Sequence, residues 1–282
     1  MSAAPRITGC TAILAHLGVP TEGFAAPKIY NPYFAARGID AAVVPLGASA
    51  DDFATLLPLV MRLSNVRGAL VTMPHKSTTL GLVDDASPTA RLAGACNAVR
   101  RAADERLVGD MFDGEGVVRA MARAGRSPFG ASALVVGSGG AGSAIAAALA
   151  TAGVARLGLA DVDRVRSEVL AARLAAHRTD LALVVGDADP SGWDLVINAT
   201  PLGMKPADPL PFDPSRLREG THVGDVVLSA GESALVAAAR ARGCTVTTGY
   251  DMLFEMIPAY LEFFGLPTTT PDTLRRLADL SS

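Results

Sequence analysis

A glycine-rich turn between a short apolar run and an alanine-rich segment constrains the fold of this chain more than any other feature. Residues 133–136 read Ala-Leu-Val-Val, and residues 137–142 read Gly-Ser-Gly-Gly-Ala-Gly. This G-x-G-x-x-G pattern follows a predicted strand and opens a predicted helix, which is the context that makes it informative. Its glycines permit a tight turn, close approach of a pyrophosphate, and close packing of helix on strand. We expect a dinucleotide-binding α/β unit; the alternative is a glycine-rich turn without a ligand.

Short apolar runs alternate with helical segments from about residue 131 onward. Such alternation is typical of a parallel sheet covered by helices on both faces. It predicts a Rossmann-type doubly wound domain over residues 111–250. The expected strands are 133–136, 156–160, 182–185, 194–197, 222–227 and 245–247, and the expected helices are 143–151, 164–177 and 233–242.

The first part of the chain predicts a second α/β domain, over residues 1–110. Residues 41–45 and 68–72 resemble strands, and 51–63 resembles a helix that Asp51 would cap. The tail 251–282 begins with an apolar helical face that could cover either domain. That face consists of Leu253, Ile257, Leu261 and Phe264.

Charge and hydropathy exclude several classes of function. The net charge is -3, so the basic excess that nucleic-acid binding requires is missing. No apolar run reaches the roughly 18 residues of a membrane-spanning helix, and the first residues lack the pattern of a signal peptide. Cys10, Cys96 and Cys244 are too far apart to suggest a disulfide framework or a metal site. We expect a cytoplasmic monomer or homodimer without metal, whose partner is a small-molecule substrate.

Asp161 follows the second strand of the predicted dinucleotide domain, 19 residues after Gly142. A carboxylate at about this distance accepts hydrogen bonds from the ribose hydroxyls of NAD and repels the 2′-phosphate of NADP. We therefore expect NAD to be preferred, although Arg164 and Arg166 could supply a counter-charge. The alternative role for Asp161 is a helix N-cap.

Three polar residues are candidates for chemistry at a hydroxyl group. Lys76 follows the strand-like segment 68–72 and could transfer a proton. Asp113, near the domain junction, could pair with Lys76, and Asn97 could hold a hydroxyl. The alternatives are a solvated lysine, a helix-capping aspartate and a turn asparagine.

Six segments, in this order, resemble the shikimate dehydrogenase family over nearly the whole chain. The order and number of the segments make the resemblance specific. They are Val71–Lys76, Gly94–Asn97, Gly109–Gly116, Gly137–Gly142, Asn198–Gly203 and Gly249–Leu253.

The resemblance implies a two-domain oxidoreductase that moves a hydride between a nicotinamide and a ring carbon bearing a hydroxyl or ketone. It implies that Lys76 and Asp113 are catalytic, that Thr72 and Asn97 contact substrate hydroxyls, and that the tail packs on the N-terminal domain. The cofactor-binding residues implied are Gly137, Gly139, Gly140, Ala141, Gly142, Asp161, Thr200 and Gly249.

Departures from the family pattern concentrate where its substrate carboxylate is bound. Phe24 and Ala26 stand at the places of two serines, and Met256 replaces a substrate-binding glutamine. The resemblance therefore implies that Phe24 and Met256 contact the substrate. We expect the chemistry to be kept and the substrate to be changed, either to a less polar one or to one anchored by a cation such as Lys28. Further departures are Leu70 for asparagine, Met111 and Phe112 for asparagine and threonine, Val162 for arginine, and Leu228 for tyrosine.

Two other functions remain open on the sequence. One is a non-catalytic ligand-binding or regulatory relative, and the other is a two-domain dehydrogenase for an unrelated substrate such as a folate. Retention of both Lys76 and Asp113 favours an enzyme over a sensor, because a sensor has no need of a proton-transfer pair.

Overall fold

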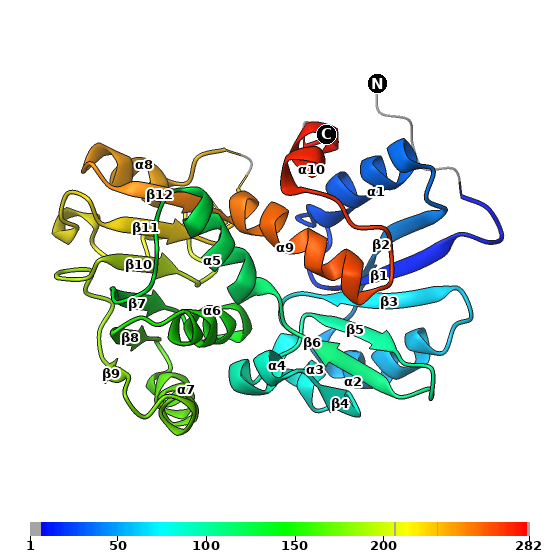
Figure 1. The fold of residues 1–282 in the computed structure, drawn as a ribbon, viewed down its shortest axis with the longest axis horizontal. Helices are drawn as coiled ribbons and strands as arrows, with labels where there is room; N and C mark the ends of the chain where they lie inside the picture. Colours follow the sequence, from blue (N-terminus) through cyan, green and yellow to red (C-terminus); the bar gives the residue numbers. More distant parts are fainter. Residues whose placement is uncertain (1–6, 206, 230, 281–282) are drawn as a thin grey trace. The chain divides into compact units, whose positions relative to one another are not determined.

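The chain folds into two compact units. The computed structural model describes residues 7–205, 207–229 and 231–280 (Figure 1). Unit 1 comprises the residues up to Arg91, Ala95–Phe112 and the segment from Ile257, and unit 2 comprises Leu92–Gly94 and Asp113–Met256.

The passages between the units differ from the boundaries expected at residues 110 and 250. The chain leaves unit 1 after Phe112 and returns after Met256, inside α9 (Gly249–Phe263). The first turns of α9 belong to unit 2 and its remainder belongs to unit 1. Because α9 is one continuous helix, no local change in the sequence marks this boundary.

Unit 1 contains a mixed six-stranded sheet in the order β2-β1-β3-β5-β6-β4. Strands β1, β2 and β3 are parallel, β4 is parallel to β6, and β5 runs antiparallel to both β3 and β6. The bounds are β1 Ala12–Gly18, β2 Ala41–Gly47, β3 Val66–Val71, β4 Asp85–Ala86, β5 Ala98–Arg101 and β6 Leu107–Asp110.

Helix α2 begins earlier than the sequence suggests. It spans Ala50–Met61, and its N-cap is Ser49, whose hydroxyl accepts from the backbone N–H of Asp52 at 3.1 Å. The expectation that Asp51 is the cap is therefore wrong: both aspartates lie in the first turn, where the helix dipole favours a negative charge. The other helices that unit 1 contains or shares are α1 Ala26–Arg37, α3 Lys76–Leu80, α4 Pro88–Ala93 and α10 Pro271–Leu277.

The two faces of the unit 1 sheet are covered by different helices. Right-handed crossovers from β1 to β2 and back to β3 place α1 and α2 on opposite faces. Ala15 and Leu17 pack with Phe53 and Leu57 of α2. Because side chains alternate along a strand, His16 faces the side of α1.

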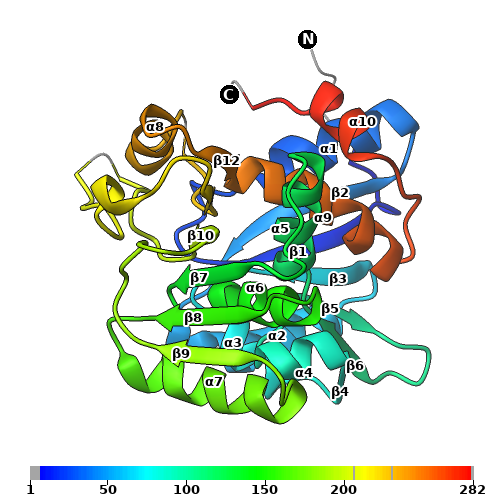
Figure 2. The same ribbon diagram turned by 60° about the vertical axis from the view of Figure 1, so that its left-hand side comes forward.

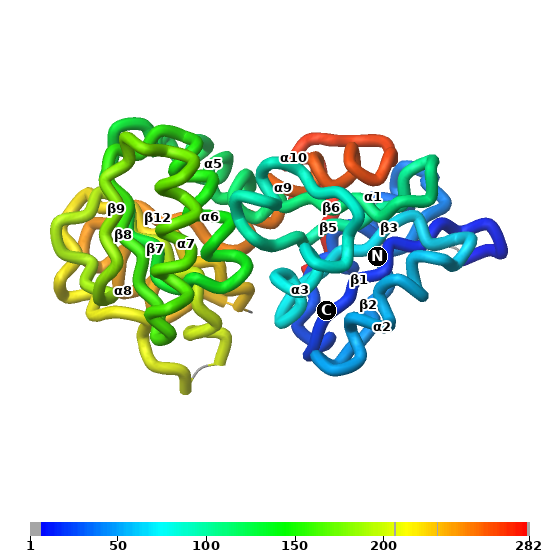
Figure 3. The backbone as a smooth tube through the Cα atoms, turned by 90° about the horizontal axis from the view of Figure 1, so that it is seen from below, coloured from blue at the N-terminus to red at the C-terminus, as the bar shows by residue number. Residues whose placement is uncertain are grey.

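The C-terminal segment belongs to unit 1. Helix α10 packs beside α1 (Figure 3), and the Tyr33 hydroxyl donates to the carbonyl of Pro267 at 2.7 Å. The apolar face predicted for the tail is buried at Ile257, Leu261 and Phe264 of unit 1 and at Leu253, which still belongs to unit 2.

Unit 2 contains a six-stranded, fully parallel sheet in the order β12-β11-β10-β7-β8-β9. Helices α6 and α7 pack along strands β7 to β9 (Figure 2), and α8 packs on β11 and β12. The strands are β7 Ser132–Val136, β8 Arg156–Ala160, β9 Ala182–Val185, β10 Leu195–Asn198, β11 His222–Asp225 and β12 Thr245–Thr248. The helices are α5 Asp113–Arg123, α6 Gly140–Thr151, α7 Arg164–His177 and α8 Ala234–Ala241.

The strand order reverses between β7 and β10. The chain moves outward from β7 through β8 to β9, then crosses back to β10 on the other side of β7. Ligands of open α/β sheets bind at the carboxyl ends of strands at such a point. The turns that follow β7 and β10 are therefore where a ligand of unit 2 is expected.

The described helices include none with both the length and the apolar composition needed to cross a bilayer.

Candidate functional site

The three motif glycines of unit 2 occupy three different environments. Gly137 has φ 100°, a left-handed conformation that favours glycine. A Cβ on Gly142 would lie 1.8 Å from the carbonyl oxygen of Gly137, so only glycine fits there. A Cβ on Gly139 would meet nothing within 4 Å. Two glycines are thus required by the protein itself, whereas Gly139 leaves open space beside the backbone.

The start of α6 suits an anionic ligand. Helix α6 begins at Gly140, its N-cap is Gly139, and no side chain caps this end. The N–H groups of a first helical turn have no partners within the helix, and together with the helix dipole they attract phosphate. The predicted residues Gly140 and Ala141 belong to this turn, which fits a pyrophosphate.

The turn after β10 lies directly against the glycine turn. A Cβ on Gly137 would lie 2.9 Å from the backbone of Ala199. Asn198 is fully buried, and its Nδ2 donates to Asp225 Oδ1 at 2.9 Å. Its Oδ1 accepts from the hydroxyl of Thr200 at 2.7 Å. This network fixes Thr200 at the reversal point of the sheet.

Asp161 holds the glycine turn from the end of β8. Its Oδ2 accepts from the backbone N–H of Ser138 at 2.6 Å, and its Oδ1 accepts from that of Asp163 at 2.9 Å. The alternative role as a helix cap is wrong, because Asp163 caps α7 by accepting from Val165 N–H at 3.2 Å.

Gly249 stands at the junction of β12 and α9. A Cβ there would lie 2.5 Å from the carbonyl oxygen of Val226, which explains the glycine by backbone packing. Its predicted contact with the cofactor stays a prediction.

The predicted substrate residues of unit 1 are tied together by backbone hydrogen bonds. Val71 N–H donates to the carbonyl of Asn97 at 2.8 Å, and Cys96 N–H donates to that of Lys76 at 2.9 Å. The turn that carries Thr72 and Lys76 therefore lies against the segment that carries Asn97.

Asn97 serves a structural role that limits its freedom. It is 1% exposed, and its Oδ1 accepts from the N–H of Phe112 at 3.1 Å. Its side chain is therefore held in one orientation. This argues against the alternative that Asn97 is an ordinary turn residue.

Asp113 and Met256 lie in unit 2, whereas Lys76 lies in unit 1. Asp113 is buried at the start of α5, where the next residue, Gly114, packs on α6: a Cβ there would lie 2.2 Å from the carbonyl oxygen of Ala144. The pairing of Lys76 with Asp113 and the substrate contact of Met256 stay predictions.

A histidine that the motifs did not single out lies beside Phe24. The rings of His16 and Phe24 stack with their centroids 4.0 Å apart. Burial, and secondarily the charge of Lys76, lower the pKa of His16 to about 3, so the imidazole is neutral near pH 7. The only sequence signal was a polar residue within the apolar segment 12–18.

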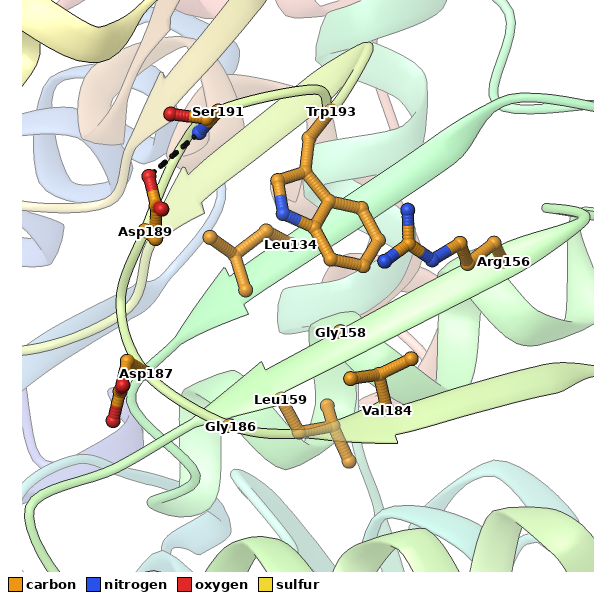
Figure 4. Close-up of a pocket in the computed structure, with 10 residues that line it drawn as sticks. All are labelled: Leu134, Arg156, Gly158, Leu159, Val184, Gly186, Asp187, Asp189, Ser191 and Trp193. Atoms are coloured by element: carbon orange, nitrogen blue, oxygen red, sulfur yellow. Dashed lines mark hydrogen bonds between the residues drawn. The ribbon is translucent and has the colours of Figure 1, made fainter.

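A cavity of about 270 Å³ in unit 2 lies apart from the glycine turn (Figure 4). It is lined by residues of β7 to β9 and of the segment that follows, and the guanidinium of Arg156 lies over the ring of Trp193, 4.0 Å from its centroid. A Cβ on Gly158 would lie 2.7 Å from that ring. Here the tryptophan covers the sheet face, and no motif residue lines the cavity.

Comparison with known proteins places these features in a family. Residues 17–99 match the shikimate dehydrogenase substrate binding domain, and residues 128–181 match the ThiF family. The shikimate dehydrogenase (NADP(+)) of Rubrobacter xylanophilus is 39% identical over 253 residues, which are 88% of this chain and 89% of that protein.

Two solved structures are similar along nearly their whole length. Shikimate 5-dehydrogenase from Listeria monocytogenes, in complex with shikimate and NAD, has a TM-score of 0.85 at 26% identity and covers 96% of this chain and 98% of its own. Quinate dehydrogenase from Corynebacterium glutamicum, in complex with NAD, has a TM-score of 0.82 at 32% identity and covers 95% and 98%. This chain therefore belongs to the shikimate dehydrogenase family of nicotinamide-dependent oxidoreductases.

Proposed function

We propose that this protein interconverts a ring secondary alcohol and its ketone, with NAD as the preferred cofactor and a substrate less polar than shikimate. The observation that carries the proposal is the glycine turn, in which Gly139, unlike Gly137 and Gly142, leaves open space where a side chain would stand. That space is next to the first turn of α6, where a pyrophosphate is favoured.

The reaction divides into a hydride transfer and a proton transfer. A nicotinamide cofactor, when bound, accepts the hydride from the alcohol carbon or returns it to the ketone. Lys76, in its amine form, accepts the hydroxyl proton through Nζ and gives it back in the reverse direction. Thr72 and Asn97 hold neighbouring hydroxyls, and Asp113 orients Lys76. Family membership and the tying of Lys76 to the segment of Asn97 support these roles.

The preference for NAD rests on the groups around the end of β8. Asp161 places a carboxylate beside the glycine turn. Arg164 pairs with Glu168 at 3.0 Å, and Arg166 pairs with Asp163 at 3.3 Å, so both nearby cations have carboxylate partners. Exposed ion pairs of this kind are weak, so they do not firmly hold the two arginines. The proposed preference for NAD therefore rests mainly on the negative charge of Asp161.

The change of substrate rests on the residues that replace the serines. Phe24 offers no hydrogen bond, and Ala26 is 6% exposed and offers none either. A carboxylate placed there would lose its hydration without gaining partners, which is costly. The polar residues Thr72, Lys76 and Asn97 are kept, so we assign the reactive hydroxyl to their end of the site.

The direct test is a substrate screen. Shikimate, quinate and cyclic alcohols without a carboxylate are incubated with NAD or NADP, and formation of the reduced cofactor is followed by its absorbance. The proposal expects reduction of NAD with at least one alcohol that lacks the carboxylate. Absence of turnover with every ring alcohol and both cofactors would contradict it.

A further inference from the structure

The strand that carries His16 places its side chain beside the substrate residues of unit 1. Strands β1 and β3 are parallel neighbours, and Thr72 N–H, just after β3, donates to the carbonyl of Leu17 at 2.9 Å. A Cβ on Gly18 would lie 2.4 Å from Thr72 Cγ2 and 3.1 Å from Phe24 Cζ. The methyl group of Thr72 and the ring of Phe24 therefore converge on the end of β1.

The His16 ring has a packing partner but lacks a polar one at Nδ1. It is 8% exposed and stacks on Phe24 at an interplanar angle of 28°. Its Nδ1 is buried and has no hydrogen-bond partner within the part of the chain that the structure describes. An unpartnered polar atom in such a place is costly, and an apolar side chain at this position would avoid that cost.

His75, the other histidine of unit 1 that stacks on an aromatic ring, is a structural residue and serves as a comparison. His75 lies against Phe53 with ring centroids 3.9 Å apart, and its Nε2 is 2.9 Å from the carbonyl oxygen of Ala48. Packing and hydrogen bonding are both satisfied there. His16 satisfies only the first, because its buried Nδ1 has no partner, which leaves Nε2 as the ring nitrogen that can meet a ligand.

The neighbouring strand presents an apolar side chain beside His16. His16 is in register with Leu70 of β3, so the two side chains lie next to each other on one face of the sheet. The segment that Leu70 belongs to carries an asparagine at this place in the family pattern. In this chain the polar side chain on this face of the sheet is therefore on β1 rather than on β3.

The tautomer of His16 follows from its surroundings. A neutral imidazole has one N–H, and its other nitrogen is an acceptor. A buried N–H without an acceptor is less tolerated than a buried acceptor without a donor. The proton therefore resides on Nε2, which is the atom that can donate to a ligand.

We propose that His16 is a specificity-determining residue that donates one hydrogen bond from Nε2 to an uncharged oxygen of the substrate, while Phe24 holds its ring by stacking. The substrate class is a ring alcohol or ketone with a hydroxyl, ester or amide where shikimate has its carboxylate. One neutral donor satisfies such an oxygen, whereas a carboxylate needs a cation or several donors. This inference rests on the proposed function, because it names the substrate of that same site.

The test compares shikimate with its methyl ester, which differ in one substituent: a charged carboxylate in the acid, and an uncharged ester group with one added methyl in the ester. Binding to the cofactor-free protein is measured by titration, with the histidine nitrogens followed by ¹⁵N NMR, and turnover of the ester is measured with NAD. The variants are His16→Val, which removes the donor, and His16→Asn, which keeps an uncharged N–H. His177→Ala, at an exposed position on α7, is the matched control.

The wild-type protein is expected to bind the ester more tightly than the acid, with a shift of the ¹⁵N signal that His16→Val removes. His16→Val should weaken ester binding and raise its KM about tenfold, with kcat within twofold. His16→Asn should recover part of that loss, and His177→Ala should match the wild type.

Three results would overturn the inference: tighter binding of the acid, no binding of either compound, or unchanged ester binding in a folded His16→Val. The proposed function fails separately. If the ester binds through His16 and no ring alcohol is turned over with either cofactor, the assignment of His16 stands and the assigned reaction does not.

Discussion

In the proposed site, Asp161 is the residue on which the choice of cofactor depends most directly. Its carboxylate is held beside the glycine turn by the N–H groups of Ser138 and Asp163. Asp161→Ala should narrow the ratio of kcat/KM for NAD to that for NADP by about 10–100-fold, since it removes acceptors for the ribose and repulsion of the 2′-phosphate. Asp180→Ala, whose partner is the surface residue Arg178, is the control. A preference of the unmodified protein for NADP would instead show that Arg164 or Arg166 leaves its carboxylate for the phosphate.

In the proposed site, Phe24 and Ala26 stand where a substrate carboxylate would bind. Losing the partners of a charged group that stays buried costs roughly 2–5 kcal/mol, or about 30-fold to several thousand-fold in affinity. We therefore expect weak or no turnover of shikimate, and a measurable gain in kcat/KM when Phe24→Ser and Ala26→Ser are combined. Efficient turnover by the unmodified chain would contradict this and direct attention to Lys28 or Tyr30 as the anchor.

The site residues differ in how far the sequence could reveal them. Lys76 and Asn97 each have an ordinary structural alternative when taken singly, and their proposed roles came from the resemblance of the segments that carry them. His16 could not be found in this way, because its meaning depends on Phe24 and Leu70, which reach it from a loop and from a neighbouring strand. Such contacts are set by strand register, which a single sequence does not show.

The glycine turn is the element where folding and binding can be separated. Gly139→Ala should destabilise unit 2 only slightly, because its Cβ would meet nothing within 4 Å and the one loss is a poorer N-cap for α6. It should weaken cofactor binding at least tenfold. Gly142→Ala should destabilise the fold, because its Cβ would lie 1.8 Å from the carbonyl oxygen of Gly137. Urea unfolding and cofactor titration of both variants provide the measurement. Unaltered cofactor affinity in Gly139→Ala would rule out the pyrophosphate at this turn.

Elements with strong local signals were predictable, and elements defined by pairing were not. Strand β8 and helix α7 have the predicted bounds, Arg156–Ala160 and Arg164–His177. Strand β1 is interrupted in its apolar pattern by His16, which weakens the local signal for a strand. Strands β5 and β6 are only four residues long and are defined by their antiparallel pairing with each other. The predictions for unit 1 therefore included the β2 and β3 regions and missed the strand between them.

At the scale of the whole molecule, the buried histidine of unit 2 links stability to pH. His222 is fully buried and lies 3.0 Å from the hydroxyl of Thr245. Burial, and secondarily the charge of Arg126, lower its pKa to about 4, against about 6.5 in an unfolded chain. Above pH 6.5 both states are neutral. Between about 6.5 and 4 only the unfolded state gains the proton, so the free energy of unfolding falls as the pH is lowered.

The size of this effect can be measured with one variant. His222→Asn cannot take up the proton, so between pH 7 and pH 5 the wild type should lose about 2 kcal/mol more than the variant does. Trp193, the sole tryptophan of the chain, is buried in the hydrophobic core of unit 2 and reports its unfolding in urea. Equal losses in the two proteins would show that His222 is protonated in the folded state as well.

The fold class followed from the alternation of short strands and helices, whereas the sheet order did not. The reversal between β7 and β10 places Gly137 against Ala199, more than 60 residues later in the chain. The periodicity of the sequence predicts that each of these turns follows a strand. Only the strand order of the sheet shows that the two turns are in contact.

The most direct test of the whole account is the effect of Lys76→Ala on the chemical step. With the best substrate from the screen, the substitution should lower kcat by about 10²–10⁴-fold, the usual contribution of a positioned acid or base. KM should change much less, because the lysine acts mainly in the transition state. The Kd for NAD should be unaltered, since the glycine turn belongs to unit 2 and Lys76 to unit 1. A kcat within a few-fold of the wild type would contradict the assignment of Lys76 as the proton-transfer residue.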